Sequence, residues 1–315
     1  MAAAPPSQHP VARVLRERAD AGSVPGARED PHRVALVLEG GGMRGVVSAG
    51  MTAALERLGM GGAFDLVVGA SAGALNGAAF LAGVAAGSAA AYHGSLATRE
   101  FVNPARLLLG RPAIDVSWVL RHASDGLDAD RHARTLASPV PLHCLTVDVD
   151  TAEPVDLVGM RTVDELWGAL LASSRMPWVG GPPIELGGRR YLDGGLAAPI
   201  PVATALGAGA THVLVLQTRP VGVPRSSGSA LADRLIVRHL RSLNPQLVGL
   251  YHGRVASYEQ VVQDIARRSE EPSPPYVLGL RPPAGTPAVK QLERRPDVLR
   301  TAAVQAEELV VAALS

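Results

Sequence analysis

Runs of apolar residues alternate with segments of helical periodicity through the middle of the chain. The run at 33–38 predicts a buried strand, and residues 44–58 predict a helix directly after it. The same alternation predicts strands at 65–69, 142–148 and 211–217, helices at 72–86, 162–174 and 199–207, and a hairpin at 184–193. Strands that alternate with helices form a mostly parallel sheet flanked by helices, so the pattern predicts an α/β fold.

The segments outside this alternating core have a different character. Residues 1–31 hold several prolines and scattered charges, with one helix candidate at 11–21, and are expected to form a flexible N-terminal arm. Residues 219–230 are rich in Pro, Gly and Ser and predict a linker. We therefore divide the chain into the arm, a catalytic domain at 32–218, the linker, and a mainly helical C-terminal extension at 231–315.

The start of the C-terminal extension has the pattern of a basic amphipathic helix. Leucines recur at helical spacing, and arginines occupy the opposite face. The leucines are Leu231, Leu235, Leu240 and Leu243, and the arginines are Arg234, Arg238 and Arg241. Two interpretations of the apolar face remain open: it packs on the protein core, or it makes transient contact with a membrane surface.

Composition and charge narrow the function classes. With 315 residues, 47% of them hydrophobic, the chain can bury a sizeable core. The formal net charge of +1 gives no strong field, so nucleic acid is not an expected partner. Residues 66–98 carry no Asp, Glu, Lys or Arg, but their Gly, Ala and Ser content fits a buried strand and a close-packed helix better than a membrane span. The first residues lack a signal-peptide pattern, so we expect a cytoplasmic protein, at most peripheral to a membrane.

Metal and cofactor chemistry has little support in the sequence. The single cysteine, Cys144, lies in a strand-like run, where it permits no intrachain disulfide and fits a buried apolar position. No cluster of His, Cys and carboxylate residues has metal-ligand spacing. No metal and no cofactor are therefore predicted.

A GASAG run at 69–73 lies between an apolar strand and helix-prone residues. This is the strand-turn-helix setting of a nucleophile elbow, in which a serine is raised on a strained turn. Such a turn needs residues without bulk two places before and two places after the nucleophile, and Gly69 and Gly73 provide them around Ser71. By itself the motif also fits an ordinary turn of small residues, because the chain holds 34 glycines.

A glycine-rich loop, EGGGMRG at 39–45, joins the first strand to the first helix of the core. Unpaired amides at such a helix start attract an anion, either the pyrophosphate of a dinucleotide or the oxyanion of an acyl-transfer intermediate. Dinucleotide binding requires an acidic residue at the end of the second strand, whereas Asp65 precedes that strand. The oxyanion interpretation is therefore favoured.

The third element is the DGG run at 193–195, which follows the predicted hairpin. Asp-Gly is a common turn pair, so this motif alone carries little weight. The order of the three elements carries more: a glycine-rich loop after the first strand, then a GxSxG elbow, then Asp-Gly-Gly far downstream. Together, and with the SSRMP segment at 173–177, they resemble the patatin-like phospholipase family across about residues 33–218.

This resemblance implies a catalytic dyad. In the family a serine attacks an ester carbonyl and an aspartate accepts its proton directly, which assigns these roles to Ser71 and Asp193. The expected substrate is a lipid or another carboxylic ester. The expected enzyme is a lipid acyl hydrolase of the phospholipase A, lysophospholipase or esterase type.

The resemblance also implies roles for the glycine motifs. The amides of Gly40, Gly41 and Gly42 are expected to form the oxyanion hole, and Arg44 is expected to organise that loop. The other motif positions are Gly45, Gly69, Gly73, Gly194 and Gly195.

Two alternatives remain at this point. A Ser-His-Asp hydrolase places its histidine after the acid, and His212, His239 and His252 are candidates. Against it, the loop carries Glu39 where esterases of that type carry His. The second alternative is a catalytically silent lipid-binding protein on the same scaffold, because fold does not fix function. The sequence leaves the oligomeric state and the lipid open.

Overall fold

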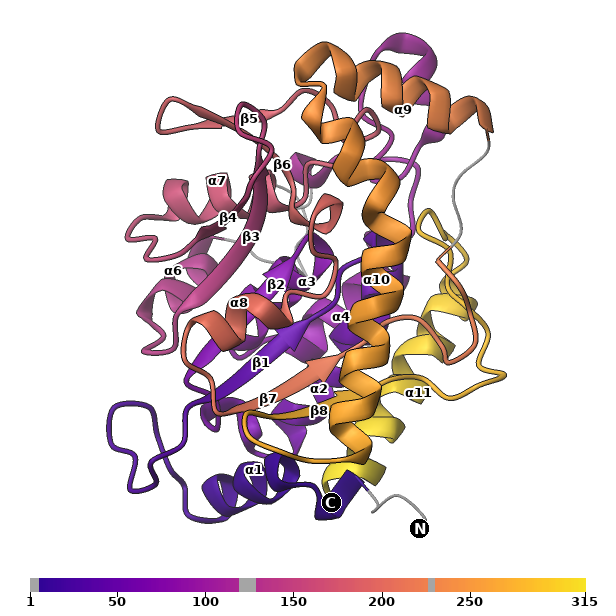
Figure 1. The fold of residues 1–315 in the computed structure, drawn as a ribbon. Coiled ribbons are helices and arrows are strands. Elements are labelled where there is room, and N and C mark those ends of the chain that lie inside the picture. The colour runs from indigo at the N-terminus through magenta and orange to yellow at the C-terminus, as the bar shows by residue number, and fades with distance from the viewer. Residues whose placement is uncertain (1–5, 119–128, 226–229) are drawn as a thin grey trace.

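Unbroken apolar runs form the central strands of the molecule. Strands β1 (Val34–Leu38), β2 (Leu66–Ala70) and β7 (His212–Leu216) are buried along their whole lengths, as parallel strands covered on both faces must be. The computed structural model describes residues 6–118, 129–225 and 230–315. Within these residues the strands form an eight-stranded sheet (Figure 1).

The sheet is mostly parallel and has the order β5-β6-β3-β2-β1-β7-β8, with β4 also paired to β3. The pairs that join β3, β2, β1, β7 and β8 are parallel, whereas β4, β5 and β6 make antiparallel pairs at one side. The remaining strands are β3 (Leu142–Asp148), β4 (Pro154–Leu157), β5 (Ile184–Leu186), β6 (Arg189–Asp193) and β8 (Tyr276–Leu280). The predicted α/β fold with a mostly parallel sheet is confirmed.

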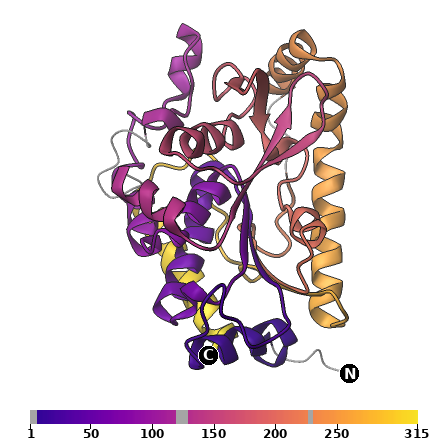
Figure 2. The same ribbon diagram turned by 90° about the vertical axis from the view of Figure 1, so that its left-hand side faces the viewer.

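Helices cover both faces of the sheet (Figure 2). Leu36 and Leu38 of β1 point into one core, and Ala35 and Val37 point into the other, because successive side chains alternate along a strand. The first core is covered by α2 (Val46–Arg57), α3 (Ala72–Leu81), α4 (Ala85–His93), α7 (Val163–Ser173) and α11 (Pro296–Leu314). The second is covered by α8 (Val202–Gly207) and the long helix α10 (Gln246–Glu270).

Shorter elements complete the described chain. The α-helices are α1 (Pro10–Asp20), α6 (Ala129–Ala137) and α9 (Ala230–Leu243). The 3-10 helices are η1 (Pro6–Gln8), η2 (Gly42–Gly45), η3 (Met60–Gly62), η4 (Pro104–Leu109) and η5 (Gly194–Leu196).

The structure differs from the predicted elements in several places, and strand β4 is one element that was not predicted. The helix predicted at 72–86 is two helices, because Gly83 adopts φ +68° and ends the first at Leu81 before α4 begins at Ala85. In addition, the C-terminal extension, which was expected to be mainly helical, contributes the strand β8 to the sheet.

The N-terminal segment is tied down where the structure describes it. Helix α1 lies at the predicted position and buries Val11 and Leu15. Arg18 is buried and bonds the carboxylates of Asp30 and Asp65 at 2.7 and 2.8 Å. This part of the expected flexible arm is therefore a packed helix, since its apolar stripe finds core to cover. Residues 1–5 of the arm and 226–229 of the predicted linker lie outside the described residues.

Helix α9 lies where the amphipathic segment was predicted, but its buried face differs from the predicted one. Leu240 is buried, whereas Leu231 and Leu235 are 68% and 37% exposed. Ile236 and Leu243 pack beside Leu240, so the face that meets the core is rotated away from the first two leucines. None of the helices in the described residues is both long and apolar enough to cross a membrane.

Strand register brings three connecting segments to one edge of the sheet. Leu38, the last residue of β1, pairs with Gly69 of β2 and with Leu216 of β7. The loops that follow these strands therefore emerge side by side, at the edge where open α/β sheets bind ligands. On the other side of β2, Ala70 pairs with Leu145, and the next residue of β3, Thr146, pairs with Asp193.

Candidate active site

Ser71 stands on a strained turn between β2 and α3. Its backbone has φ +57° and ψ −130°, a conformation that residues with a side chain rarely adopt. The Ser71 amide donates to the carbonyl oxygen of Ser173 at 3.1 Å and to its hydroxyl at 3.0 Å. The Ser173 hydroxyl in turn donates to the Leu145 carbonyl oxygen at 2.7 Å, so helix α7 and strand β3 hold the turn in place.

The two glycines around Ser71 are required by close packing of backbone. A Cβ on Gly69 would stand 2.5 Å from the Ala74 amide nitrogen. A Cβ on Gly73 would stand 2.3 Å from the Leu38 carbonyl oxygen. Both distances are far below van der Waals contact, so any side chain at either position displaces the elbow.

Asp193 ends β6 and is a buried residue, at 5% exposure. Its Oδ1 accepts from the Gly195 amide at 2.7 Å, and its own amide donates to the Arg175 carbonyl at 2.9 Å. Burial raises the pKa of Asp193 to about 6, against smaller lowering effects of the Ser71 hydrogen bond, the Gly195 amide and the charge of Arg225. A carboxyl group in this setting is a stronger base than one in water.

Gly194 lets Asp193 approach the sheet. A Cβ on Gly194 would stand 2.2 Å from the Leu145 carbonyl oxygen, the same oxygen that accepts from Ser173. The Asp-Gly-Gly motif and the elbow therefore share one anchor on β3.

The glycine-rich loop presents free amides beside Ser71. Gly41 and Gly42 have φ +147° and +59°, which favour glycine. A Cβ on Gly40 would stand 2.3 Å from the Ala70 carbonyl oxygen and 2.9 Å from Ser71 Cβ, so the loop lies directly against the elbow. In the described part of the chain, the amides of these three glycines donate to no protein acceptor. The loop is thus a set of unpaired donors at the carboxyl end of β1.

Arg44 and Thr218 anchor the glycine-rich loop through hydrogen bonds. The Arg44 Nε donates to the Thr218 hydroxyl at 3.1 Å, and that hydroxyl donates to the Gly40 carbonyl oxygen at 3.2 Å. The Thr218 amide donates to a carboxylate oxygen of Glu39 at 2.6 Å. Burial lowers the pKa of Arg44 to about 10, partly offset by Glu39, so Arg44 stays charged at neutral pH.

Gly45 and Asn76 lock the start of α2 against α3. The Asn76 side chain is buried, and its Nδ2 donates to the Gly45 carbonyl oxygen at 2.8 Å and to the Ser48 hydroxyl at 3.0 Å. A Cβ on Gly45 would lie 2.5 Å from the hydroxyl oxygen of Tyr92. The helix that follows the glycine loop is therefore fixed relative to the helix that follows Ser71.

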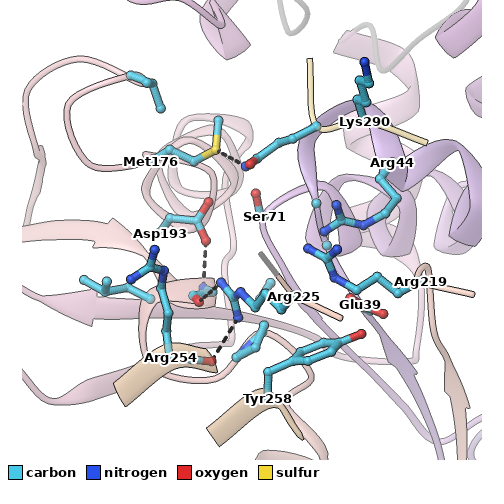
Figure 3. A pocket seen from close by; sticks show the side chains of 18 of the residues that line it. Glu39, Arg44, Ser71, Met176, Asp193, Arg219, Arg225, Arg254, Tyr258 and Lys290 are labelled. Atoms are coloured by element: carbon cyan, nitrogen blue, oxygen red, sulfur yellow. Dashed lines mark hydrogen bonds between the residues drawn. The ribbon is translucent and has the colours of Figure 1, made fainter. Parts of the chain in front are cut away.

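These groups meet in a cavity of about 620 Å³ (Figure 3). The predicted site residues that line it are Ser71, Asp193, Gly40, Gly41, Arg44 and Gly195. Gly42, Gly45, Gly69, Gly73 and Gly194 are not among its lining residues and act through packing or loop shape. The remaining lining mixes apolar groups, such as Met176, with arginines.

The candidate histidines lie elsewhere. His212 begins β7 and pairs with Val34, the first residue of β1, so it lies at the opposite end of these strands from Ser71. Burial lowers the pKa of His212 to about 4, and its Nδ1 lies 3.0 Å from the Thr211 hydroxyl. His239 and His252 belong to α9 and α10. None of the described residues that line the cavity is a histidine.

Sequence reasoning missed several residues of this site. Ser173 belongs to the SSRMP segment noted above, but the sequence assigned it no role. Thr218 follows the predicted strand at 211–217 and belongs to no motif. Arg219 and Arg225 lie in the segment predicted to be a linker, where Pro, Gly and Ser content gave no signal of a cavity wall. Arg254 also lines the cavity, from helix α10.

A loop before α11 covers the cavity. The Gln291 side-chain amide donates to the Met176 sulfur at 2.9 Å, and the Gln291 carbonyl oxygen accepts from the Met43 amide at 3.0 Å. The glycine loop and the segment before Asp193 are thus bridged by one residue.

Comparisons with known proteins identify a matching family and several relatives of this chain. The chain matches the family described as Patatin-like phospholipase over residues 36–206. It is 32% identical over 192 residues to the uncharacterized protein YjjU of Escherichia coli, a match that covers 60% of this chain and 53% of that protein. It is 33% identical over 218 residues to the uncharacterized NTE family protein Rv1063c of Mycobacterium tuberculosis, covering 67% and 56%. The chain thus spans about half the length of the curated relatives it matches.

A solved structure is also similar. It is VipD from Legionella pneumophila, with a TM-score of 0.42 and 10% sequence identity, covering 90% of this chain and 67% of that one. The family match takes in the glycine-rich loop, the GxSxG elbow and the Asp-Gly-Gly motif, and it spans more than half of the chain. The chain belongs to the patatin-like phospholipase family.

Proposed function

We propose that the protein hydrolyses carboxylic esters of lipids through an acyl-enzyme on Ser71, with Asp193 as the general base. Family membership supports lipid acyl hydrolysis at the level of the family. The observation that carries the assignment to residues is their convergence: a serine on a strained elbow, a buried carboxyl group and unpaired glycine amides border one cavity.

In the proposed first step, the Ser71 oxygen bonds to the ester carbonyl carbon while its proton passes to Asp193. A pKa of about 6 leaves Asp193 largely ionised at neutral pH yet more basic than an ordinary carboxylate. The carbonyl oxygen becomes an oxyanion, and we expect the unpaired amides of Gly40 and Gly41, which line the cavity, to stabilise it. Collapse of this intermediate breaks the bond to the alcohol, and the alcohol leaves with the proton held by Asp193.

Water completes the reaction in the proposed second step. It attacks the acyl carbon, gives its proton to Asp193 and releases the fatty acid as the Ser71 oxygen regains that proton. The role proposed for Arg44 is structural, since its guanidinium group bonds Thr218 beneath the loop.

A covalent probe tests the proposal directly. A fluorophosphonate should label the native protein and leave Ser71→Ala unlabelled, and hydrolysis of p-nitrophenyl butyrate should disappear in Ser71→Ala and in Asp193→Asn. His212→Ala, His239→Ala and His252→Ala, each checked for folding, serve as controls and should retain most activity. Labelling that survives Ser71→Ala, or a folded His variant as inactive as Asp193→Asn, contradicts the dyad.

A further inference from the structure

One wall of the cavity is formed by arginines from outside the matched region at 36–206. We term Arg219, Arg225 and Arg254 the cationic wall. Arg219 follows β7 after Thr218, Arg225 lies a few residues further along the chain, and Arg254 is on α10. Figure 3 shows all three below Ser71, with Arg225 between the other two.

Two tyrosines on α10 support the cationic wall. The guanidinium carbons of Arg219 and Arg225 each lie 5.6 Å from the centre of the Tyr258 ring. The guanidinium carbon of Arg254 lies 3.5 Å from the centre of the Tyr251 ring. Aromatic faces of this kind hold a guanidinium group without neutralising it. The wall is therefore preformed and remains positively charged.

Nearby carboxylates offset only part of the charge of the wall. The buried Glu39 lines the same cavity, but within the described residues it forms no ion pair with these three arginines. Arg254 has an acidic neighbour, Asp233, at 3.6 Å. Across the described residues, neither Arg219 nor Arg225 forms an ion pair, and the buried Nε of Arg219 has no hydrogen-bond partner. Burial and the charges of Arg219 and Arg254 lower the pKa of Arg225, against smaller raising effects of Glu39 and Tyr258. Grouped arginines that are partly buried and unpaired repel one another, and a bound anion removes that repulsion.

The wall also touches the proposed catalytic base through one residue. Arg225 donates to the Gly195 carbonyl oxygen at 3.4 Å, and the Gly195 amide donates to Asp193 at 2.7 Å. In the proposed mechanism Asp193 returns a proton to the departing alcohol. The cationic wall therefore lies next to the alcohol part of a bound ester.

We infer that the cationic wall binds a phosphate group on the alcohol part of the substrate, and that net-anionic phosphate esters are preferred over zwitterionic phosphocholine esters. The inference rests on the proposed function. Arginine donors match the oxygen spacing of a phosphate, and the unpaired charge of the wall disfavours a quaternary ammonium group close by. A phosphomonoester supplies the counter-charge that Arg219 and Arg225 lack.

A different explanation is that the arginines only tune Asp193, because the charge of Arg225 lowers the pKa of that carboxyl group. The two explanations differ in a measurable way. Tuning alone changes hydrolysis of every ester by the same factor. A phosphate subsite changes the ratio of kcat/KM between anionic and neutral esters, in which any effect on the base cancels.

The experiment compares three hexanoyl esters that stay monomeric in solution: hexanoyl lysophosphatidate, hexanoyl lysophosphatidylcholine and the neutral hexanoylglycerol. Monomeric substrates remove any attraction of a charged lipid surface to the arginines of α9. In the native protein we expect kcat/KM to be higher for hexanoyl lysophosphatidate than for hexanoyl lysophosphatidylcholine. In Arg219→Gln and Arg225→Gln the ratio of lysophosphatidate to hexanoylglycerol should fall at least ~10-fold, the size of a lost hydrogen bond to a charged group. Arg241→Gln, an exposed position on α9 outside the cavity lining, is the matched control and should keep the native ratio.

Binding gives a readout that does not need catalysis. Glycerol 3-phosphate titrated into Ser71→Ala by calorimetry should bind, and Ser71→Ala combined with Arg225→Gln should bind it at least ~10-fold more weakly. Unchanged ratios and unchanged glycerol 3-phosphate binding overturn the phosphate subsite while leaving Ser71-dependent hydrolysis intact. Loss of Ser71-dependent hydrolysis of all three esters is instead a failure of the proposed function, and calorimetry still decides the subsite.

Discussion

The Ser71 amide donates to both the carbonyl oxygen and the hydroxyl of Ser173, at 3.1 and 3.0 Å. The strained turn that carries Ser71 is thus restrained by a residue more than a hundred positions later in the chain. The Ser173 hydroxyl also bonds β3, so one side chain ties the elbow to the strand that flanks it.

Replacement of Ser173 by alanine should loosen this turn. The variant loses two buried hydrogen bonds, and we expect about 1–3 kcal/mol lower unfolding free energy together with a reduced kcat. Ser174→Ala is the matched control, because the buried Ser174 hydroxyl has no hydrogen-bond partner in the described structure. Denaturant titration and steady-state kinetics measure both effects. Equal behaviour of the two variants would show that the Ser173 contacts do not hold the elbow.

The pKa of Asp193 sets the expected pH dependence of activity. Burial raises this pKa to about 6, and the proposed base acts only when ionised. On a neutral ester, kcat/KM should therefore increase as pH rises through about 6 and level off above it. Arg225→Gln should move this midpoint upward, since the charge of Arg225 lowers the pKa of Asp193. A profile that is flat across this range contradicts a role for Asp193 as base.

The same group should make stability depend on pH. The pKa of Asp193 is higher in the folded chain than its ordinary value of 3.8, so the folded state binds the proton more tightly. The free energy of unfolding should therefore decrease as pH rises from about 4 to about 6, by at most about 3 kcal/mol from this residue. Asp193→Asn removes the buried charge, and it should raise Tm at pH 8 while leaving Tm near pH 4 almost unchanged. A lower Tm for this variant at pH 8 would contradict the assigned cost of burial.

Thr218 should matter for turnover more than for folding. Thr218→Val removes the hydroxyl that accepts from Arg44 and donates to the Gly40 carbonyl oxygen. It keeps the hydrogen bond from the Thr218 backbone amide to the Glu39 carboxylate. We expect kcat to fall ~10-fold or more, with KM little changed, because the glycine amides lose their alignment. Thr135→Val is a suitable control: its buried hydroxyl bonds the Ala78 carbonyl at 3.0 Å, and Thr135 does not line the cavity. Equal kcat values in the two variants would argue against the loop-holding role.

Glycine-to-alanine substitutions should separate packing from flexibility. Gly73→Ala places a methyl group 2.3 Å from the Leu38 carbonyl oxygen, which backbone atoms cannot relieve cheaply, so we expect several kcal/mol of destabilisation or failure to fold. Gly249→Ala, within α10 and facing open space, should instead stabilise by about 0.5–1 kcal/mol. Thermal unfolding of both variants checks the contrast.

The sequence predicted the elements whose apolar pattern is long and uniform. β1 is a continuous apolar run, and β3 has the predicted bounds, Leu142–Asp148. β8 was missed because Pro274 and Pro275 precede a short stretch that contains Gly279, a pattern that signals a loop. Its strand conformation depends on pairing with β7, a contact that no local pattern encodes.

Site prediction had a similar limit. Ser71 and Asp193 belong to short motifs whose chemistry is local, and the structure brings both to one cavity. Arg225 belongs to no motif, and a single arginine in a Pro-rich segment looks like a solvated charge. Its position over Tyr258 is set by the course of the chain after β7 and by α10, so only the tertiary structure reveals it.

The cavity draws on two stretches of the chain, the matched family region and the segment that follows it. The family region contributes Ser71 and Asp193, whereas the cationic wall comes from beyond it. If the cationic wall binds phosphate as proposed, substitutions in the later stretch change which esters fit while Ser71 and Asp193 stay in place. A graft of residues 219–258 between relatives is expected to transfer selectivity while the host keeps its own Ser71 and Asp193, which makes this stretch a starting point for engineering ester selectivity.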